Sequence, residues 1–197
     1  MSPRVATPPA TRDRIVHTAL RLFSERGTTA VSVRDLAEAA GVTVPGLYYH
    51  FASKAEVIQA VYRARGMGRS VDELGADETP TAGPIEDRIV EQARREFARL
   101  VADEEFLRLM QRESVLGDPD ALEVGRALGA NWRARWRAVL AGATDLDPST
   151  DLATAADAIP TFLWGLFVEY LNHHDRAIEG RIPGFARLVA PSLRKAE

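Results

Sequence analysis

Residues 33–51 read VRDLAEAAGVTVPGLYYHF, and this stretch decides the fold of the N-terminal part of the chain. Apolar Leu36 and small Ala37 fit one short helix, apolar Leu47 fits a second, and Gly41 lies in the turn between them. A small residue lets two helices cross closely, and glycine accepts the positive φ that a tight turn requires. The pattern predicts a helix-turn-helix.

Helix start and stop signals surround this stretch. Upstream, apolar residues recur at spacings of three and four until Gly27, which suits the end of a helix. Ser32 with Asp35, and Ser53 with Glu56, have the spacing of N-terminal capping boxes. We therefore expect a compact module of four helices: residues 11–26, about nine residues from Ser32, Thr43 to Phe51, and Ser53 to Met67.

The rest of the chain also follows helical periodicity. Residues 68–84 lack periodicity, are acidic and are rich in Gly, Pro and Thr, so we expect a loop there. Beyond it, no segment alternates as a strand does. The fold class is therefore expected to be all-α, with a disordered tail at 1–10, a helix-turn-helix domain at 11–67, the acidic loop at 68–84 and a larger helical domain at 85–197.

Composition excludes several classes of protein. The 197 residues are 46% hydrophobic and 27% charged, as in ordinary globular proteins. The chain has no cysteine, which removes disulfides, cysteine zinc sites and cysteine nucleophiles, and is compatible with the cytoplasm. Residues 1–12 do not resemble a signal peptide, and the apolar run at 158–168 is about half of the ~20 residues that a membrane span needs. We expect a soluble cytoplasmic protein without a membrane partner.

The net charge of −3 conceals an uneven distribution. Residues 1–70 hold ten Lys or Arg and five Asp or Glu, a net charge of +5, whereas the remainder holds 15 against 23, a net charge of −8. A basic N-terminal end favours a nucleic-acid partner for that end of the chain.

The second helix of the motif is suited to reading DNA. Its first residues face outward in a helix-turn-helix, where they can enter a major groove. Hydroxyl, aromatic, imidazole and cationic side chains around it are typical partners of phosphate oxygens. The candidate DNA-binding residues are Thr29, Ser32, Arg34, Thr43, Val44, Pro45, Gly46, Tyr48, Tyr49, His50 and Lys54.

From Thr11 to about Val61, and especially over SVRDLAEAAGVTVPGLYYHFASKAEVI, the chain resembles the TetR family of bacterial transcriptional regulators. It matches the family's G-V-x-x-x-x-L-Y-x-H-F-x-x-K signature. The resemblance implies that bases or the groove are faced by Arg34, Thr43, Val44, Gly46 and Tyr49, and that phosphates are held by Tyr48, His50 and Lys54. Val44 and Gly46 carry no side-chain hydrogen-bond donor, so we expect few direct base contacts from them.

The resemblance also implies a function for the whole chain: a homodimeric repressor, released from a palindromic operator by a largely apolar small molecule, without a cofactor. Residues 85–197 would then bind the effector and form the dimer. The effector candidates are Phe97, Met110, Trp132, Trp136 and Phe162. The dimer candidates are Leu163, Leu166, Phe167, Tyr170, Leu188 and Val189.

Two alternatives stay open. The first is a constitutive DNA-binding protein that no small molecule releases. The second is a helical metal-dependent hydrolase using Glu169, His173 and His174, since Glu169 and His173 are four residues apart on one helix face. The only other histidines are His17 and His50, in the DNA-reading module, so the spacing of a di-iron bundle is absent and we expect neither an enzyme nor a metal site.

Overall fold

The computed structural model describes residues 11–64 and 82–195. Within these ranges the regular elements are helices, apart from two isolated β-bridges, which confirms the all-α prediction. The predicted tail at 1–10 and most of the predicted loop at 68–84 lie outside the described residues. The chain forms two compact units. One comprises Met1–Arg69 with Glu105–Gly125, and the other Ser70–Glu104 with Arg126–Glu197.

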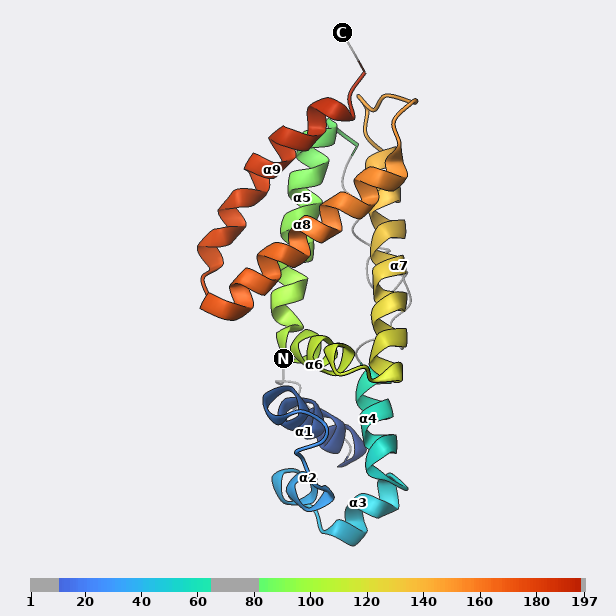
Figure 1. Ribbon diagram of the computed structural model, residues 1–197, viewed down its shortest axis with the longest axis vertical. Helices are drawn as coiled ribbons and strands as arrows, with labels where there is room; N and C mark the ends of the chain where they lie inside the picture. The colour runs from blue at the N-terminus through green and yellow to red at the C-terminus, as the bar shows by residue number, and fades with distance from the viewer. Residues whose placement is uncertain (1–10, 65–81, 196–197) are drawn as a thin grey trace, which may run out of the picture. The chain divides into compact units, whose positions relative to one another are not determined.

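The first unit begins with four helices, which Figure 1 shows in blue to teal: α1 (Thr11–Arg26), α2 (Val33–Ala39), α3 (Val44–His50) and α4 (Lys54–Tyr62). The predicted caps are present. Ser32 caps α2 in a reciprocal capping box with Asp35, and Thr43 caps α3. Ser53 accepts a hydrogen bond from the Glu56 N–H at the start of α4. These local signals set the helix boundaries.

Large apolar side chains fill the core of these four helices. Ile15 and Phe23 from α1, Leu36 from α2 and Leu47 from α3 have no exposed surface, and Phe51, which ends α3, has almost none. Burial of a side chain of this size stabilises the fold by about 1.5–3 kcal/mol. The packing therefore fixes the orientation of the short α3, which at seven residues would not be stable alone.

The first unit also contains Glu105–Gly125, a segment that the sequence analysis placed in the helical domain predicted to begin at residue 85. This segment includes most of α6 (Glu104–Val115) and the first residues of α7 (Pro119–Ala141), where Asp118 accepts a hydrogen bond from the Ala121 N–H. Residues of α6 are buried at helical spacing: Phe106, Leu109, Met110 and Glu113. Val115, the last residue of α6, is 82% exposed and lies outside this buried face.

The second unit is built from α5 (Ile85–Ala102), the remainder of α7, α8 (Leu152–His173) and α9 (Ile182–Val189), with short 3-10 helices at Arg176–Arg181 and Ala190–Ser192. α5 packs against both α8 and α9 (Figure 1). Among the described residues, α8 alone is long and apolar enough to cross a membrane, a test that core helices of soluble proteins also pass. Its inward residues, including Ile159 and Leu163, are completely buried in the unit.

Candidate nucleic-acid interface

Backbone hydrogen bonds fix the turn between α2 and α3. The Val42 N–H donates to the Ala37 carbonyl at 2.9 Å, and the Gly41 N–H donates to the Glu38 carbonyl at 3.1 Å. This is the Schellman arrangement, which needs a left-handed residue directly after the helix cap. Gly41 supplies it with a φ of +64°, as its place in the motif predicted. The turn thereby sets the direction in which α3 leaves α2.

One face of α3 is anchored and the other is open to solvent. Leu47 is completely buried, whereas Tyr48 is 49% and Tyr49 is 86% exposed. The Tyr49 ring meets the His50 ring edge to face, with their centroids 5.2 Å apart. Two exposed tyrosines on a seven-residue helix leave a large aromatic and hydroxyl-bearing surface open to solvent, which is what a groove-binding helix offers.

Two of the predicted hydroxyl contacts differ in availability. The Ser32 hydroxyl donates to Asp35 Oδ2 at 2.8 Å and accepts from the Asp35 N–H at 3.1 Å, so it is engaged in capping α2. The Thr43 Oγ1 accepts from the Gly46 N–H at 3.1 Å, which leaves the Thr43 hydroxyl proton available to a ligand. The observed role of the Ser32 hydroxyl is therefore structural, as the cap of α2.

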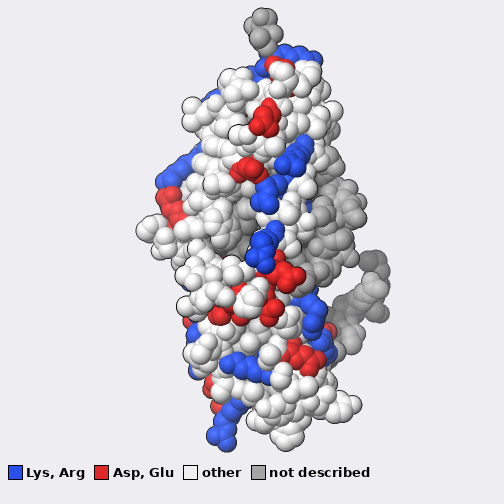
Figure 2. All heavy atoms as spheres, turned by 45° about the vertical axis from the view of Figure 1, so that its right-hand side comes forward, with Lys and Arg blue, Asp and Glu red and all other residues white. Residues whose placement is uncertain are grey.

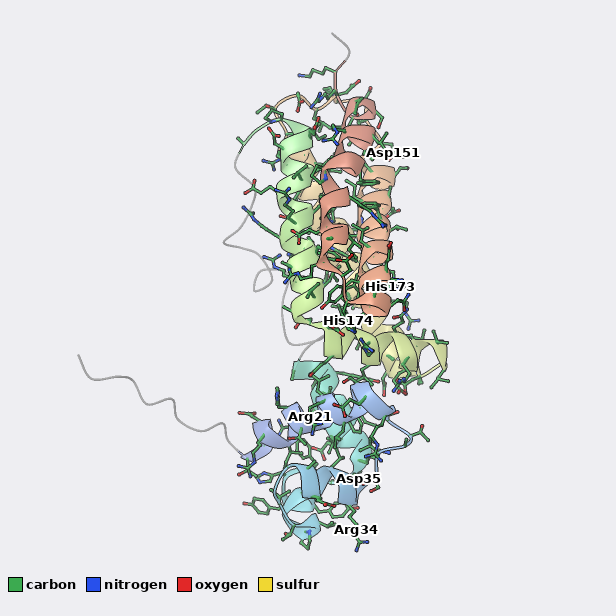
Figure 3. The ribbon with its side chains drawn as sticks, turned by 90° about the vertical axis from the view of Figure 1, so that its left-hand side faces the viewer. Arg21, Arg34, Asp35, Asp151, His173 and His174 are labelled. Atoms are coloured by element: carbon green, nitrogen blue, oxygen red, sulfur yellow. The ribbon has the colours of Figure 1, made fainter. Side chains whose placement is uncertain are left out.

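Positive charge at this surface comes from individual side chains. Arg34 is exposed at the outer edge of the unit (Figure 3), and within the described residues it makes no ion pair. Two hydrogen bonds from Ser32, first from its N–H and then from its hydroxyl, lower the pKa of the Asp35 carboxyl, and the charges of Arg26 and Lys54 lower it further. Asp35 thus stays ionised beside these cations.

The basic excess of the N-terminal end is smaller in the described part. Residues 11–64 hold seven Lys or Arg and five Asp or Glu, because Arg4, Arg65 and Arg69 lie outside the described ranges. Basic, acidic and uncharged side chains are interspersed on the face that Figure 2 shows. The placement of single cations beside α3 therefore matters more than a broad positive field.

Three supporting residues escaped the sequence analysis. Arg14 of α1 donates through Nε to the Ala40 carbonyl at 3.0 Å and so holds the turn, while the Arg12 guanidinium lies 4.8 Å from the centre of the Phe51 ring. Glu113 of α6 is 4% exposed and accepts two hydrogen bonds from Thr28. Helical spacing with Phe106, Leu109 and Met110 marks Glu113, but a carboxylate is not expected in a core stripe.

Comparisons with known proteins agree with this geometry. The family model described as bacterial regulatory proteins of the tetR family matches residues 15–61, which span the helix-turn-helix. Over these residues the chain is similar to the N-terminal domain of TetR-family regulators. α3 lies within the matched residues, as the second helix of the helix-turn-helix.

Individual TetR relatives match over the same end of the chain. The transcriptional repressor KstR2 of Mycolicibacterium smegmatis is 39% identical over 64 residues, which are 32% of this chain and 31% of that protein. The regulator TtgR of Pseudomonas putida is 45% identical over 51 residues, which are 26% of this chain and 24% of that protein. The alignments thus span about a quarter to a third of these relatives' lengths.

The similarity of fold extends over nearly the whole chain. The structure of KstR2 of Mycobacterium tuberculosis superimposes with a TM-score of 0.65 at 22% identity, covering 98% of this chain and all of that one. A transcriptional regulator from Saccharomonospora viridis, solved in complex with choline, gives a TM-score of 0.73 at 18% identity and covers 94% of this chain and 98% of that one. The second unit therefore has the fold of TetR regulators.

The predicted effector residues do not all lie together. Phe97 and Trp136 are completely buried in the second unit, and Trp132 is partly buried there. Phe162 stacks on Phe185 of α9, with ring centroids 3.8 Å apart. Met110 belongs to the first unit.

The predicted dimer residues differ in exposure. Leu163, Leu166, Phe167 and Tyr170 are all at most 8% exposed, so they pack in the core of a single chain and do not form an exposed apolar stripe. Leu188 of α9 is 81% exposed, and Val189 is intermediate. Leu188 is thus the most exposed of the predicted dimer residues, and its place in a dimer stays a prediction.

The residues of the hydrolase alternative are engaged in other contacts. The Arg181 guanidinium donates to both Glu169 carboxylate oxygens, at 2.6 and 2.9 Å. His174 caps the C-terminal end of α8 with a φ of +50°. Figure 3 shows His173 and His174 at this end of the helix. No group of three or more His, Cys, Asp or Glu able to hold a metal ion occurs in the described ranges.

Proposed function

We propose that this TetR-family protein is a cytoplasmic repressor that binds a palindromic operator as a homodimer and leaves it when a small molecule binds the second unit. The observation that carries the proposal is α3, a capped and anchored helix that exposes Tyr48 and Tyr49. The relatives named repressors support the direction of regulation.

The chemistry of α3 favours recognition through the DNA backbone and groove shape. Tyr48, His50 and Lys54 are suited to phosphate oxygens, which position a protein on the duplex. Thr43 and Tyr49 offer a hydroxyl, a methyl group and an aromatic edge toward base pairs. Because one seven-residue helix buries little surface, a useful affinity requires two copies, on half-sites ~34 Å apart.

The dimer part of the proposal rests on α9. Leu188 exposes most of its apolar side chain, which favours a partner surface over solvent. Leu188→Asp should shift the protein from dimer to monomer in light scattering after size exclusion. The matched control is Leu122→Asp, an exposed apolar position of the first unit, which should leave the dimer intact. Equal mass for both variants and the parent protein would contradict the assignment.

The effector part is supported by the fold of the second unit, which the Saccharomonospora viridis regulator shares and which there accompanies bound choline. The direct experiment has two steps. Selection from random duplexes identifies the operator, and a panel of small apolar molecules is then screened for release of that operator. A constitutive DNA-binding protein would bind the same operator and be released by no compound.

A further inference from the structure

Three side-chain atoms of α5 and α7 in the second unit are buried without a hydrogen-bond partner in the described part of the chain: Gln92 Oε1, Trp132 Nε1 and Trp136 Nε1. Gln92 is 2% exposed and Trp136 is completely buried. Folded proteins satisfy nearly all buried polar groups, because an unpaired donor or acceptor that has lost water is costly. Three such atoms in one unit call for a common explanation.

Two bridges between α5 and α7 place these atoms in register. Arg88 of α5 donates through Nε to the Val139 carbonyl of α7 at 2.9 Å. Two turns further along α5, Glu96 accepts from Arg135 Nη1 of α7 at 3.3 Å. The two helices therefore run in opposite directions past each other, joined by long side chains at two levels.

Gln92 and Trp136 lie between the same two bridges. On α5, Gln92 is four residues from both Arg88 and Glu96, so all three share one helix face. On α7, Trp136 follows Arg135 and precedes Val139. Trp132 is one turn before Trp136 and projects from the same face.

The orientation of the Gln92 amide is fixed by its neighbour. Gln92 Nε2 donates to Glu96 Oε1 at 2.7 Å, and that carboxylate is held in turn by Arg135. The oxygen of the amide is thus the atom that lacks a partner, while the two indole nitrogens are donors only. Ile89, three residues before Gln92 on α5, and Val139, three residues after Trp136 on α7, are buried apolar residues of the same helix stretches.

We propose that Gln92, Trp132 and Trp136 recognise a largely apolar molecule that carries a hydroxyl group. The hydroxyl oxygen accepts from Trp136 Nε1 and its proton is donated to Gln92 Oε1, so one group satisfies both unpartnered atoms. Trp132 Nε1 donates to a second oxygen of the molecule where one is present. This inference rests on the proposed function, in which the second unit binds the effector, and it names the chemistry of that effector.

The test uses two sets of aromatic probes, each with a hydroxyl compound, its methyl ether without the O–H donor, and a hydrocarbon without oxygen: phenol, anisole and toluene, and 2-naphthol, 2-methoxynaphthalene and naphthalene. The full-length protein labelled with nitrogen-15 reports on its three indole N–H groups by NMR, and Trp→Phe variants assign them. A hydroxyl probe should move the Trp136 indole signal downfield and bind about tenfold more tightly than its methyl ether, the effect of one hydrogen bond. Trp164 of α8, outside the polar group, is the matched control whose signal should stay.

A variant separates recognition from simple burial. Gln92→Leu substitutes an apolar side chain of similar size and so removes the Oε1 acceptor. The tenfold preference for the hydroxyl probe over its methyl ether should therefore fall to within about twofold. The proposal is overturned when neither hydroxyl probe moves the Trp136 signal, or when the hydroxyl, ether and hydrocarbon bind equally well to the parent protein. The probe measurements on the parent protein need no variant to fold.

Failure of this inference is distinct from failure of the proposed function. A hydroxyl probe that binds at Trp136 without releasing operator DNA supports the recognition chemistry and contradicts ligand-responsive regulation by it. A compound that releases DNA while all three indole signals stay in place supports regulation and overturns the inference.

Discussion

Glu113 completes the cap of α1 by accepting hydrogen bonds from Thr28, which lies 85 residues before it in the chain. Its carboxylate accepts from the Thr28 N–H at 3.1 Å and from the Thr28 hydroxyl at 2.8 Å. Gly27, at a φ of +82°, ends α1 by donating to the Phe23 carbonyl, which leaves the next N–H without a helical acceptor. Glu113 thus ties α6 to the start of the helix-turn-helix.

Glu113→Ala should therefore destabilise the protein. The substitution leaves the buried Thr28 N–H and hydroxyl unpaired, at a cost of about 1–3 kcal/mol in the free energy of unfolding. Thermal or urea unfolding measures it. Glu105→Ala, which removes an exposed carboxylate from the same helix, is the control and should change stability little. Equal stability of the two variants would show that the Glu113 bonds contribute nothing.

Two glycines of the first unit should respond to alanine with opposite signs. Gly41 has open space around it but a φ of +64°, so Gly41→Ala strains the backbone and should destabilise by about 1–2 kcal/mol. Gly125 lies inside α7 with open space around it, so Gly125→Ala should stabilise by about 0.5–1 kcal/mol. Unfolding curves of both variants decide, and the same sign for both would contradict the turn geometry.

Lys54→Ala should weaken DNA binding by a similar factor on all sequences. Loss of one phosphate contact per chain releases fewer counterions, so the slope of log affinity against log salt should flatten by about 0.9 per contact. Binding isotherms at several salt concentrations measure the slope. Glu38→Ala, which removes an exposed negative charge from α2, serves as a charge control. An unchanged slope for Lys54→Ala would remove Lys54 from the phosphate contacts.

Thr43→Ser should change sequence preference and leave stability nearly unchanged. Serine keeps the oxygen that accepts from the Gly46 N–H and so keeps the cap of α3, but it lacks the methyl group that can contact a thymine methyl. Selection of preferred duplexes for both proteins is the measurement. An identical preference would place Thr43 outside the groove.

The Asp35 cap should make stability depend on acid pH. Its folded pKa lies below the ordinary value of 3.8, so the ionised carboxylate stabilises the fold above that value. The stabilisation is lost as the pH falls through the lowered folded pKa. The stability difference between the parent protein and Asp35→Asn should be constant at neutral pH and shrink in acid. A difference that grows in acid would reverse the assigned sign.

Local signals carried most of the fold prediction. Each of the predicted caps Ser32, Thr43 and Ser53 lies within three residues of the N–H that it binds, so the sequence contains the whole interaction. The bond from Thr28 to Glu113 spans 85 residues and involves a carboxylate in an apolar stripe, so periodicity could not reveal it.

Sequence periodicity also did not determine the long-range contacts of the second unit. α8 is apolar on most sides, so its pattern did not distinguish residues that face the chain's own core from those that face a partner. Leu163 and Phe167, which the sequence predicts at a dimer surface, are both fully buried within the single chain. The shared position of the unpaired Gln92 and Trp136 atoms is evident only from the structure, in which two side-chain bridges set the register of α5 and α7.

The central claim is that α3 reads a specific operator in a homodimer. Its most direct measurement is the affinity for the selected duplex relative to a scrambled duplex of equal length and composition, at one physiological salt concentration. We expect at least about a thousandfold preference, with two protected half-sites one helical turn apart. Equal affinity for the two duplexes, or protection of a single half-site, would contradict it.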